Sequence, residues 1–426
     1  MQALSTALAL GLGVVLARTL GPDGYGIYAF AFALMSLLMV VAEAGVPTLV
    51  MREVAAAEAR EQGGLLRGAL RRGLQFVAIV SVFVSVVGIL CLTLIADRIE
   101  TTNLYTLGVM LLALPIAALA KTLAHALKGL RRVVMAQALE LLLRPVLVLA
   151  SVVGMALVLS PSPLTPSLAM GGQLVAAIVV GIFSFILLRR TIVAIVRKET
   201  LEFRSREWLK SALPLSLIGA ALVINSQIDV VMLGWFEPDE QVGIYRVAVQ
   251  GSVLVILSLQ AVTAVVTPYI ARLYAQGDTA LLQRIVTRAA QASALPALLI
   301  VILLVGAGQD ILSWVFGPEY AAAHVSLVIL AMGRLAVAVL GICGPLLTMT
   351  GFERLQSQTI WFAVVANVIL NLTLIPWLGV VGAAISTALT AFGWIALLAL
   401  IAQSRLRICV SPIRFRQLLP GKIKGK

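Results

Sequence analysis

The amino-acid sequence predicts an all-α integral membrane protein with about twelve transmembrane helices in two six-helix lobes around a central cavity. Three observations lead there: the composition, a series of long uncharged runs, and basic residues confined to alternate loops. Of the 426 residues, 61% are hydrophobic and 12% charged, and the mean hydropathy is +1.05. Soluble domains are about a quarter charged. The composition therefore excludes a soluble globular protein.

Apolar runs of the length that crosses the hydrocarbon core of a bilayer, about 20 residues, follow one another along the chain. Residues that break helices fall between them, as at Gly21-Pro22, Pro161-Ser162-Pro163, Pro238 and Gly317-Pro318. The predicted spans are 1–17, 27–51, 74–96, 104–127, 133–158, 167–188, 209–235, 243–269, 289–316, 322–350, 357–376 and 379–403.

The first span is unusual because it begins at Met1 without a charged lead-in. It offers only about 17 apolar residues, the lower limit for crossing. We interpret it as a truncated or late start. A signal peptide fits less well, since the segment lacks a basic beginning and is followed by Arg18 and a Gly-Pro turn.

Lys and Arg residues concentrate in every second loop, the asymmetry that sets orientation in a membrane. In one set of alternate loops the basic residues are Arg18 and Arg98. The other set, which includes the C-terminal tail, contains many Lys and Arg residues. Both termini are therefore expected in the cytoplasm. The net charge of +13 is then explained by loops beside anionic headgroups, and no nucleic-acid partner is expected.

The longest polar connection divides the chain into six spans on either side. We predict an N-lobe at 1–188, a cytoplasmic linker at 189–208, a C-lobe at 209–403 and a basic tail at 404–426. Short motifs repeat across the division: Gly26-Ile27-Tyr28 returns as Gly243-Ile244-Tyr245. An even number of spans gives both lobes the same orientation, so an axis along the membrane normal would relate them, with a cavity between.

Motifs for catalysis or cofactor binding are missing from the sequence. It contains no Walker loop, dinucleotide fingerprint or nucleophile elbow. Its three cysteines and two histidines are too scattered for a disulfide framework or a metal site. We expect no catalytic residue, no metal and no cofactor.

Ordered motifs through most of the chain carry a resemblance to a known family. They include Leu16 to Pro22, Gly24 to Tyr28 and Gly45 to Arg52 in the first half, and Asp229 to Gly234, Val242 to Ala248, Phe316 to Tyr320, Thr348 to Gly351, Asn367 to Asn371 and Gly379 to Ile385 in the second. The chain resembles the polysaccharide and O-antigen flippases of the multidrug, oligosaccharidyl-lipid and polysaccharide exporter superfamily. No single motif is diagnostic; the ordered set carries the resemblance.

The resemblance implies alternating access and movement of an isoprenoid-diphosphate-linked oligosaccharide from the cytoplasmic to the outer leaflet of the cytoplasmic (inner) membrane. It implies a place in polysaccharide biosynthesis, such as that of the O-antigen of lipopolysaccharide. Polysaccharide polymerases and glycosyltransferases are the implied partners, besides membrane lipids.

Charges within predicted spans are the candidate site residues, because a charge at the bilayer centre costs about 2.5–3.5 kcal/mol on insertion scales. Arg144 and Arg334 lie deep in the fifth and tenth spans, and guanidinium groups match phosphate with paired donors. We therefore predict that both line a cavity and bind the diphosphate. For Arg144 a structural alternative stays open: Glu140 lies one turn earlier, and Pro145 would kink the helix.

Other polar residues within spans are candidates for cargo binding or ion coupling. Lys121 lies close to a predicted loop, so extension of its side chain to the interface explains it better than cargo binding. The paired asparagines could equally join helices instead of binding sugar hydroxyls. The further cavity candidates are Lys121, Gln137, Asn225, Asn367 and Asn371, and the candidates for a coupling ion are Asp229 and Glu43.

Other functions fit the sequence less well. A cation-coupled drug or metabolite exporter of the same superfamily would want an acid-rich pocket, whereas the midspan charges favour arginine. A carrier of the major facilitator type would have a Gly-rich, Asp-Arg loop where this chain has Arg52-Glu53-Val54-Ala55. A membrane enzyme would need polar catalytic loops, and the predicted outer loops are short.

Overall fold

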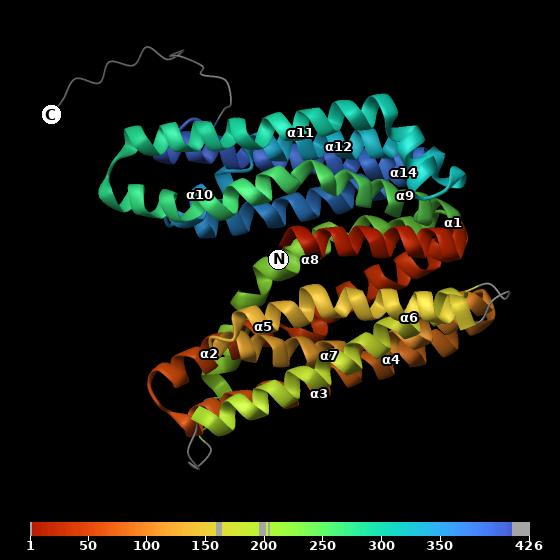
Figure 1. Ribbon diagram of the computed structural model, residues 1–426, viewed down its shortest axis with the longest axis horizontal. Coiled ribbons are helices and arrows are strands. Elements are labelled where there is room, and N and C mark those ends of the chain that lie inside the picture. The colour runs from red at the N-terminus through yellow and green to blue at the C-terminus, as the bar shows by residue number, and fades with distance from the viewer. Residues whose placement is uncertain (1, 159–163, 196–201, 203–204, 411–426) are drawn as a thin grey trace. The chain divides into compact units, whose positions relative to one another are not determined.

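The structure, a computed structural model, describes residues 2–158, 164–195, 202 and 205–410 (Figure 1). All regular elements within these ranges are helices. The predicted Pro161-Ser162-Pro163 turn, the middle of the predicted linker and the predicted tail from residue 411 onward lie outside the described residues.

The helices follow one another with short connections. Those of the first half are α1 Gln2–Glu43, α2 Val46–Ala59, α3 Gly63–Leu94, η1 Ala96–Arg98, α4 Thr101–Gly129, α5 Val133–Ala138, η2 Leu139–Leu143, α6 Arg144–Val158 and α7 Pro166–Ile195. Those of the second half are α8 Ser205–Phe236, α9 Asp239–Ser252, η3 Val253–Ile256, α10 Leu257–Gln276, α11 Thr279–Val315, η4 Pro318–Ala323, α12 His324–Leu340, α13 Cys343–Met349 and α14 Glu353–Leu406.

Ten helical segments of the described chain are long and apolar enough to cross a membrane. Two of them, α1 and α14, each contain a break where two predicted spans meet. The break in α1 is Gly21, with φ 69° and ψ 177°, and the break in α14 is Gly379, with φ 54° and ψ −131°. Only glycine adopts such angles readily. The predicted all-helical membrane fold is confirmed, and the two breaks reconcile ten segments with about twelve predicted spans.

Contacts group the chain into two compact units. Unit 1 comprises residues 1–247, 312–323 and 371–383, and unit 2 comprises 248–311, 324–370 and 384–426. The predicted lobes at 1–188 and 209–403 concern the membrane topology of the two halves and remain a prediction.

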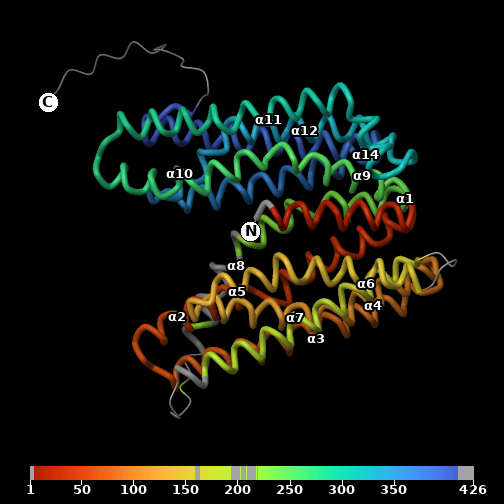
Figure 2. The backbone as a smooth tube through the Cα atoms, viewed as in Figure 1, coloured from red at the N-terminus to blue at the C-terminus, as the bar shows by residue number. Residues whose placement is uncertain are grey.

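Helix α4 lies at the centre of the first-half bundle in unit 1. It packs most extensively against α7 (Figure 1), and it also packs against α3 (Figure 2), α2 and α1. Small side chains permit this close packing, as is typical of membrane helices: the buried residues of α4 include Ala113, Ala117, Ala118, Ala120 and Ala124. Side chains of α4 therefore contact several other helices.

Unit 2 has an apolar core of its own. Buried side chains of α10, α11, α13 and α14 form it, among them Ile270, Leu282, Val286, Leu346 and Leu398. Gly333 of α12 packs directly on Ala388 of α14, where an added Cβ would lie 2.8 Å from the backbone. This unit thus uses the same small-residue packing.

The repeated Gly-Ile-Tyr motifs of the two halves contact each other inside unit 1. A Cβ added to Gly26 of α1 would lie 1.8 Å from the carbonyl oxygen of Asp239, and one added to Gly243 of α9 would lie 2.2 Å from that of Pro22. Both positions therefore need glycine for the backbones to approach. Asn103 Nδ2 of α4 donates to the Asp239 carboxylate at 2.9 Å, which fixes the start of α9 against a third helix.

Candidate functional site

A cavity of about 410 Å³ lies within unit 1, lined by α1, α4, η2, α6, α7 and α8. Its polar lining residues are Ser36, Lys121, His125, Glu140, Arg144, Ser226 and Gln227. Lys121 and Arg144 are basic, His125 is positively charged when it is protonated, and Glu140 is acidic. Predicted candidates Lys121 and Arg144 are thus brought to one cavity from separate helices.

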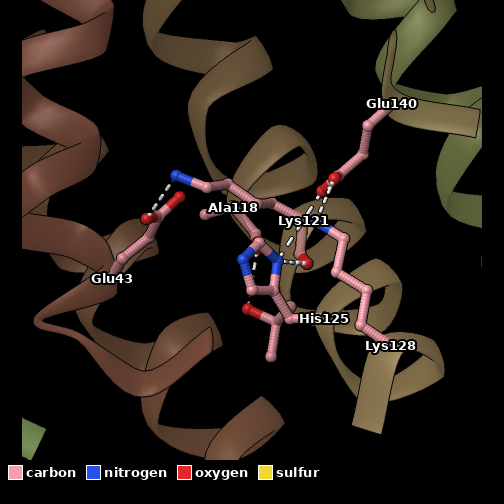
Figure 3. Close-up of polar contacts among 7 residues, drawn as sticks. Glu43, Ala118, Lys121, His125, Lys128 and Glu140 are labelled. Atoms are coloured by element: carbon pink, nitrogen blue, oxygen red, sulfur yellow. Dashed lines mark hydrogen bonds and ion pairs between the residues drawn. The ribbon is translucent and has the colours of Figure 1, made fainter. Parts of the chain in front are cut away.

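Helix α4 presents a basic stripe at helical spacing, Lys121, His125 and Lys128 (Figure 3). Lys121 Nζ lies 2.7 Å from Glu43 Oε2, which comes from the end of α1. The Lys121 side chain is 40% exposed and that of Glu43 is 10% exposed. Lys121 therefore has a specific anionic partner, a contact that the spacing along α4 alone could not indicate.

Glu140 is directed towards α4 (Figure 3). Its Oε2 lies 2.5 Å from Lys128 Nζ, and its Oε1 lies 3.6 Å from His125 Nδ1. The structural alternative for Arg144, a direct pair with Glu140, is therefore replaced by pairing between Glu140 and α4. Glu140 thus pairs directly with Lys128, while it and Glu43 still interact electrostatically with Arg144.

The helix around these residues is widened by one π turn, Leu139–Leu143. Pro145 follows, and proline lacks an N–H group and clashes with the carbonyl four residues earlier. A π turn accommodates that conflict, and such turns are frequent at functional sites. Glu140 and Arg144, at the two ends of this turn, both line the cavity.

Arg144 is held from the side of α7. Its Nη2 donates to Gln173 Oε1 at 3.3 Å, and Gln173 Nε2 donates to the Tyr28 hydroxyl at 2.8 Å. Tyr28 stacks between Tyr25 and Phe32 along α1. A neutral hydrogen-bond partner, Gln173, therefore orients the Arg144 guanidinium at the wall of the cavity. Sequence reasoning missed Gln173 and Tyr28, since neither is charged.

Two predicted cavity residues lie elsewhere. Gln137 and Asn225 are half-buried, and neither is among the residues that line the cavity. On α8 the neighbours Ser226 and Gln227 line it in place of Asn225. The hydrophobic pattern of α8 is too uniform to have distinguished these adjacent positions.

A second buried polar cluster in unit 1 surrounds Asp229 of α8. Asn371 Nδ2 of α14 donates to Asp229 Oδ1 at 2.6 Å, and the Tyr245 hydroxyl of α9 donates to Asp229 Oδ2 at 3.1 Å. All three side chains are buried. The cluster thus joins three helices through one acid, as expected for an intramembrane carboxylate that needs partners.

The remaining candidates, Arg334 and Asn367, belong to unit 2. Arg334 Nε donates to Ser252 Oγ at 2.8 Å, and Asn367 Nδ2 donates to Thr390 Oγ1 at 3.4 Å. The structure therefore distributes the predicted site residues over separate clusters. Within the described ranges, no group of three or more His, Cys, Asp or Glu side chains is arranged to hold a metal ion.

The helices and the charged cavity define a multi-pass membrane protein of the all-helical class. Residues 1–274 match the family described as "Polysaccharide biosynthesis protein". The chain belongs to this family, as its ordered motifs predict.

Two curated relatives are archaeal proteins from Haloferax volcanii. The chain is 30% identical over 227 residues to the probable flippase AglR, covering 51% of this chain and 45% of the relative. It is 31% identical over 170 residues to the probable low-salt glycan biosynthesis flippase Agl15, covering 39% of this chain and 35% of the relative. The matches thus span less than half the length of either relative.

Among solved structures, the lipid II flippase MurJ in an inward closed conformation is similar, with a TM-score of 0.74 and 13% identity. The similarity covers 94% of this chain and 86% of MurJ. At this identity the match establishes the fold alone.

Proposed function

We propose that the chain is a flippase that moves an isoprenoid-diphosphate-linked oligosaccharide from the cytoplasmic to the outer leaflet by alternating access. The observation that carries the proposal is the polar cavity in unit 1, where Lys121, His125 and Arg144 line one space. A diphosphate on a membrane lipid needs cationic donors at membrane depth, and an arginine supplies paired donors in a planar fork.

The rest of the cavity suits a glycan. Ser36, Ser226 and Gln227 offer hydroxyl and amide groups that can bond sugar hydroxyls. A volume of about 410 Å³ is within the range of small-ligand pockets, about 300–1,000 Å³. We assign the phosphates to Arg144 and Lys121 and the first sugar to the α8 side.

Family membership and the names of AglR and Agl15 support transport in glycan biosynthesis. We further propose the cytoplasmic (inner) membrane as the location, with both termini in the cytoplasm, on the asymmetry of basic loops. Polysaccharides such as the O-antigen of lipopolysaccharide, and polymerases or glycosyltransferases as partners, belong to the same proposal.

Glu43 and Asp229 are the acids we propose for coupling to a cation. Glu43 Oε1 is buried and has no hydrogen-bond partner within the described part of the chain, so it can accept a proton or bind a cation. Asp229 is 5% exposed and is positioned by Asn371 and Tyr245. Protonation or ion binding at either acid would alter contacts between helices, which is how an ion can bias a transporter.

The competing function is a cation-coupled drug or metabolite exporter of the same superfamily. It requires an anionic cavity, and the acids near this cavity, Glu43 and Glu140, are each paired with a lysine. The lining therefore favours an anionic cargo.

The test is to deplete cells of the protein and ask which leaflet holds the lipid-linked oligosaccharide, using a probe that reaches only the outer face. Accumulation inside, relieved by the restored gene, is the expected result. Normal exposure outside combined with altered resistance to cationic drugs would support the exporter instead.

The same assay tests the cavity. Arg144→Ala is expected to slow appearance outside by about tenfold or more, because hydrogen bonds to charged groups contribute about 1.5–3 kcal/mol. The matched control is Arg132→Ala, since Arg132 is exposed and does not line the cavity. Equal rates for the two variants at equal abundance would contradict the assignment of Arg144.

A further inference from the structure

A second cavity, of about 300 Å³, lies in unit 1 between α2 and α3, with Trp208 near the start of α8 as part of its wall. It shares no lining residue with the candidate substrate cavity. Its lining residues are Val46, Leu49, Val50, Glu53, Ala69, Arg72, Gly73, Gln75, Phe76, Ile79 and Trp208. No step of the proposed transport uses this space.

The cavity wall is mostly hydrocarbon, and its acid is already engaged. Glu53 Oε1 accepts from Arg52 Nη2 at 2.8 Å, and Glu53 Oε2 accepts from Trp208 Nε1 at 3.2 Å. These contacts compensate the carboxylate charge. Arg72 adds a basic side chain to this mostly apolar lining, an arrangement that suits an amphiphile with an anionic end.

The cavity adjoins the lipid-facing side of α3. Ile79 in its lining is 70% exposed, and the same stripe continues with Phe83 at 66% and Leu90 at 58%. Continuous exposed apolar side chains at helical spacing are expected where a helix contacts lipid. The other end of the lining, at Arg72, follows the arginine-rich start of α3, where basic side chains meet headgroups.

We propose that this cavity is a binding site for an anionic membrane phospholipid, with one hydrocarbon chain inside it and the phosphate against Arg72. The site is small and apolar, so it fits a hydrocarbon chain and excludes a glycan. Since α2, α3 and Trp208 of α8 form its walls, a bound lipid connects three helices. The inference stands on these contacts and does not depend on the proposed transport activity.

The experiment uses purified full-length protein and native mass spectrometry during titration with phosphatidylglycerol or with phosphatidylcholine of the same chains. The native protein is expected to retain phosphatidylglycerol preferentially. Arg72→Ala should weaken that binding about tenfold, the effect of losing one hydrogen-bonded charge. Arg71→Ala is the matched control, because Arg71 is the adjacent exposed arginine outside the lining, and it should change binding less than twofold.

A second variant tests the apolar part. Ala69 is 4% exposed and lines the cavity, so Ala69→Phe should fill it and weaken retention of both lipids. Unchanged retention in both Arg72→Ala and Ala69→Phe would overturn the proposal, as would equal losses in Arg72→Ala and Arg71→Ala. Displacement of phosphatidylglycerol by an equimolar isoprenyl phosphate would overturn the assigned occupant.

Discussion

The close approach of α1 and α9 at Gly26 and Gly243 allows a prediction worked from geometry. In Gly26→Ala the new Cβ would lie 1.8 Å from the Asp239 carbonyl oxygen. Carbon and carbonyl oxygen normally approach to about 3.3 Å, so the two backbones must separate by about 1.5 Å. Asn103 holds the Asp239 side chain from α4, which resists that separation.

Overpacking of this kind costs about 1–3 kcal/mol. We expect Gly26→Ala to lower the unfolding temperature of the purified protein by about 2–6 °C, at about 2 °C per kcal/mol for a long chain. Tryptophan fluorescence during heating in detergent measures it. Gly243→Ala should act in the same direction, and the double variant should cost less than the sum, because both substitutions separate the same pair of backbones.

The control is Gly11→Ala in the same helix. Gly11 has no heavy atom within 4 Å of an added Cβ, so alanine should be neutral or slightly stabilising there. Equal unfolding temperatures for Gly26→Ala and Gly11→Ala would refute the argument from close approach.

Two further predictions follow from the charged residues. A double-mutant cycle of Glu43→Gln and Lys121→Met, measured by thermal unfolding, should give a coupling energy of about 1 kcal/mol. The value is small because the Lys121 side chain is 40% exposed. If the effects of the two substitutions on stability are additive, the pair does not stabilise the protein. Arg334 of unit 2 lies outside the cavity assigned to the phosphates, but the sequence predicts that it too binds the diphosphate. Arg334→Ala should then abolish transport at unchanged membrane abundance, whereas Met332→Ala, at a position 54% exposed, should not. Normal transport by Arg334→Ala would contradict that prediction.

The positions of most spans could be predicted because a membrane helix is recognised by its own length and apolar content. Gly21 belongs to a predicted helix breaker, and Gly379 lies where two predicted spans follow each other directly. The structure retains helical conformation on both sides of each glycine, so one long element contains two predicted spans.

The candidate site was only partly predictable. Arg144 and Lys121 could be identified because charge within an apolar run is conspicuous, and both line the cavity. Ser226 and Gln227 could not be identified, because neutral polar residues on an apolar helix do not indicate which face of the helix points into a cavity. The spacing of Glu140 and Arg144 along one helix allowed a direct pair, whereas Glu140 pairs with Lys128 of α4, a contact that the spacing could not indicate.

The sequence by itself determined the membrane class and the approximate number of spans, because both depend on local composition. Only the tertiary structure decided the partners: Glu43 for Lys121, Lys128 for Glu140 and Gln173 for Arg144. Periodicity gives the faces of one helix, whereas a partner depends on which helices are neighbours and how their small residues let them approach. Those are properties of packing, and no local run of residues contains them.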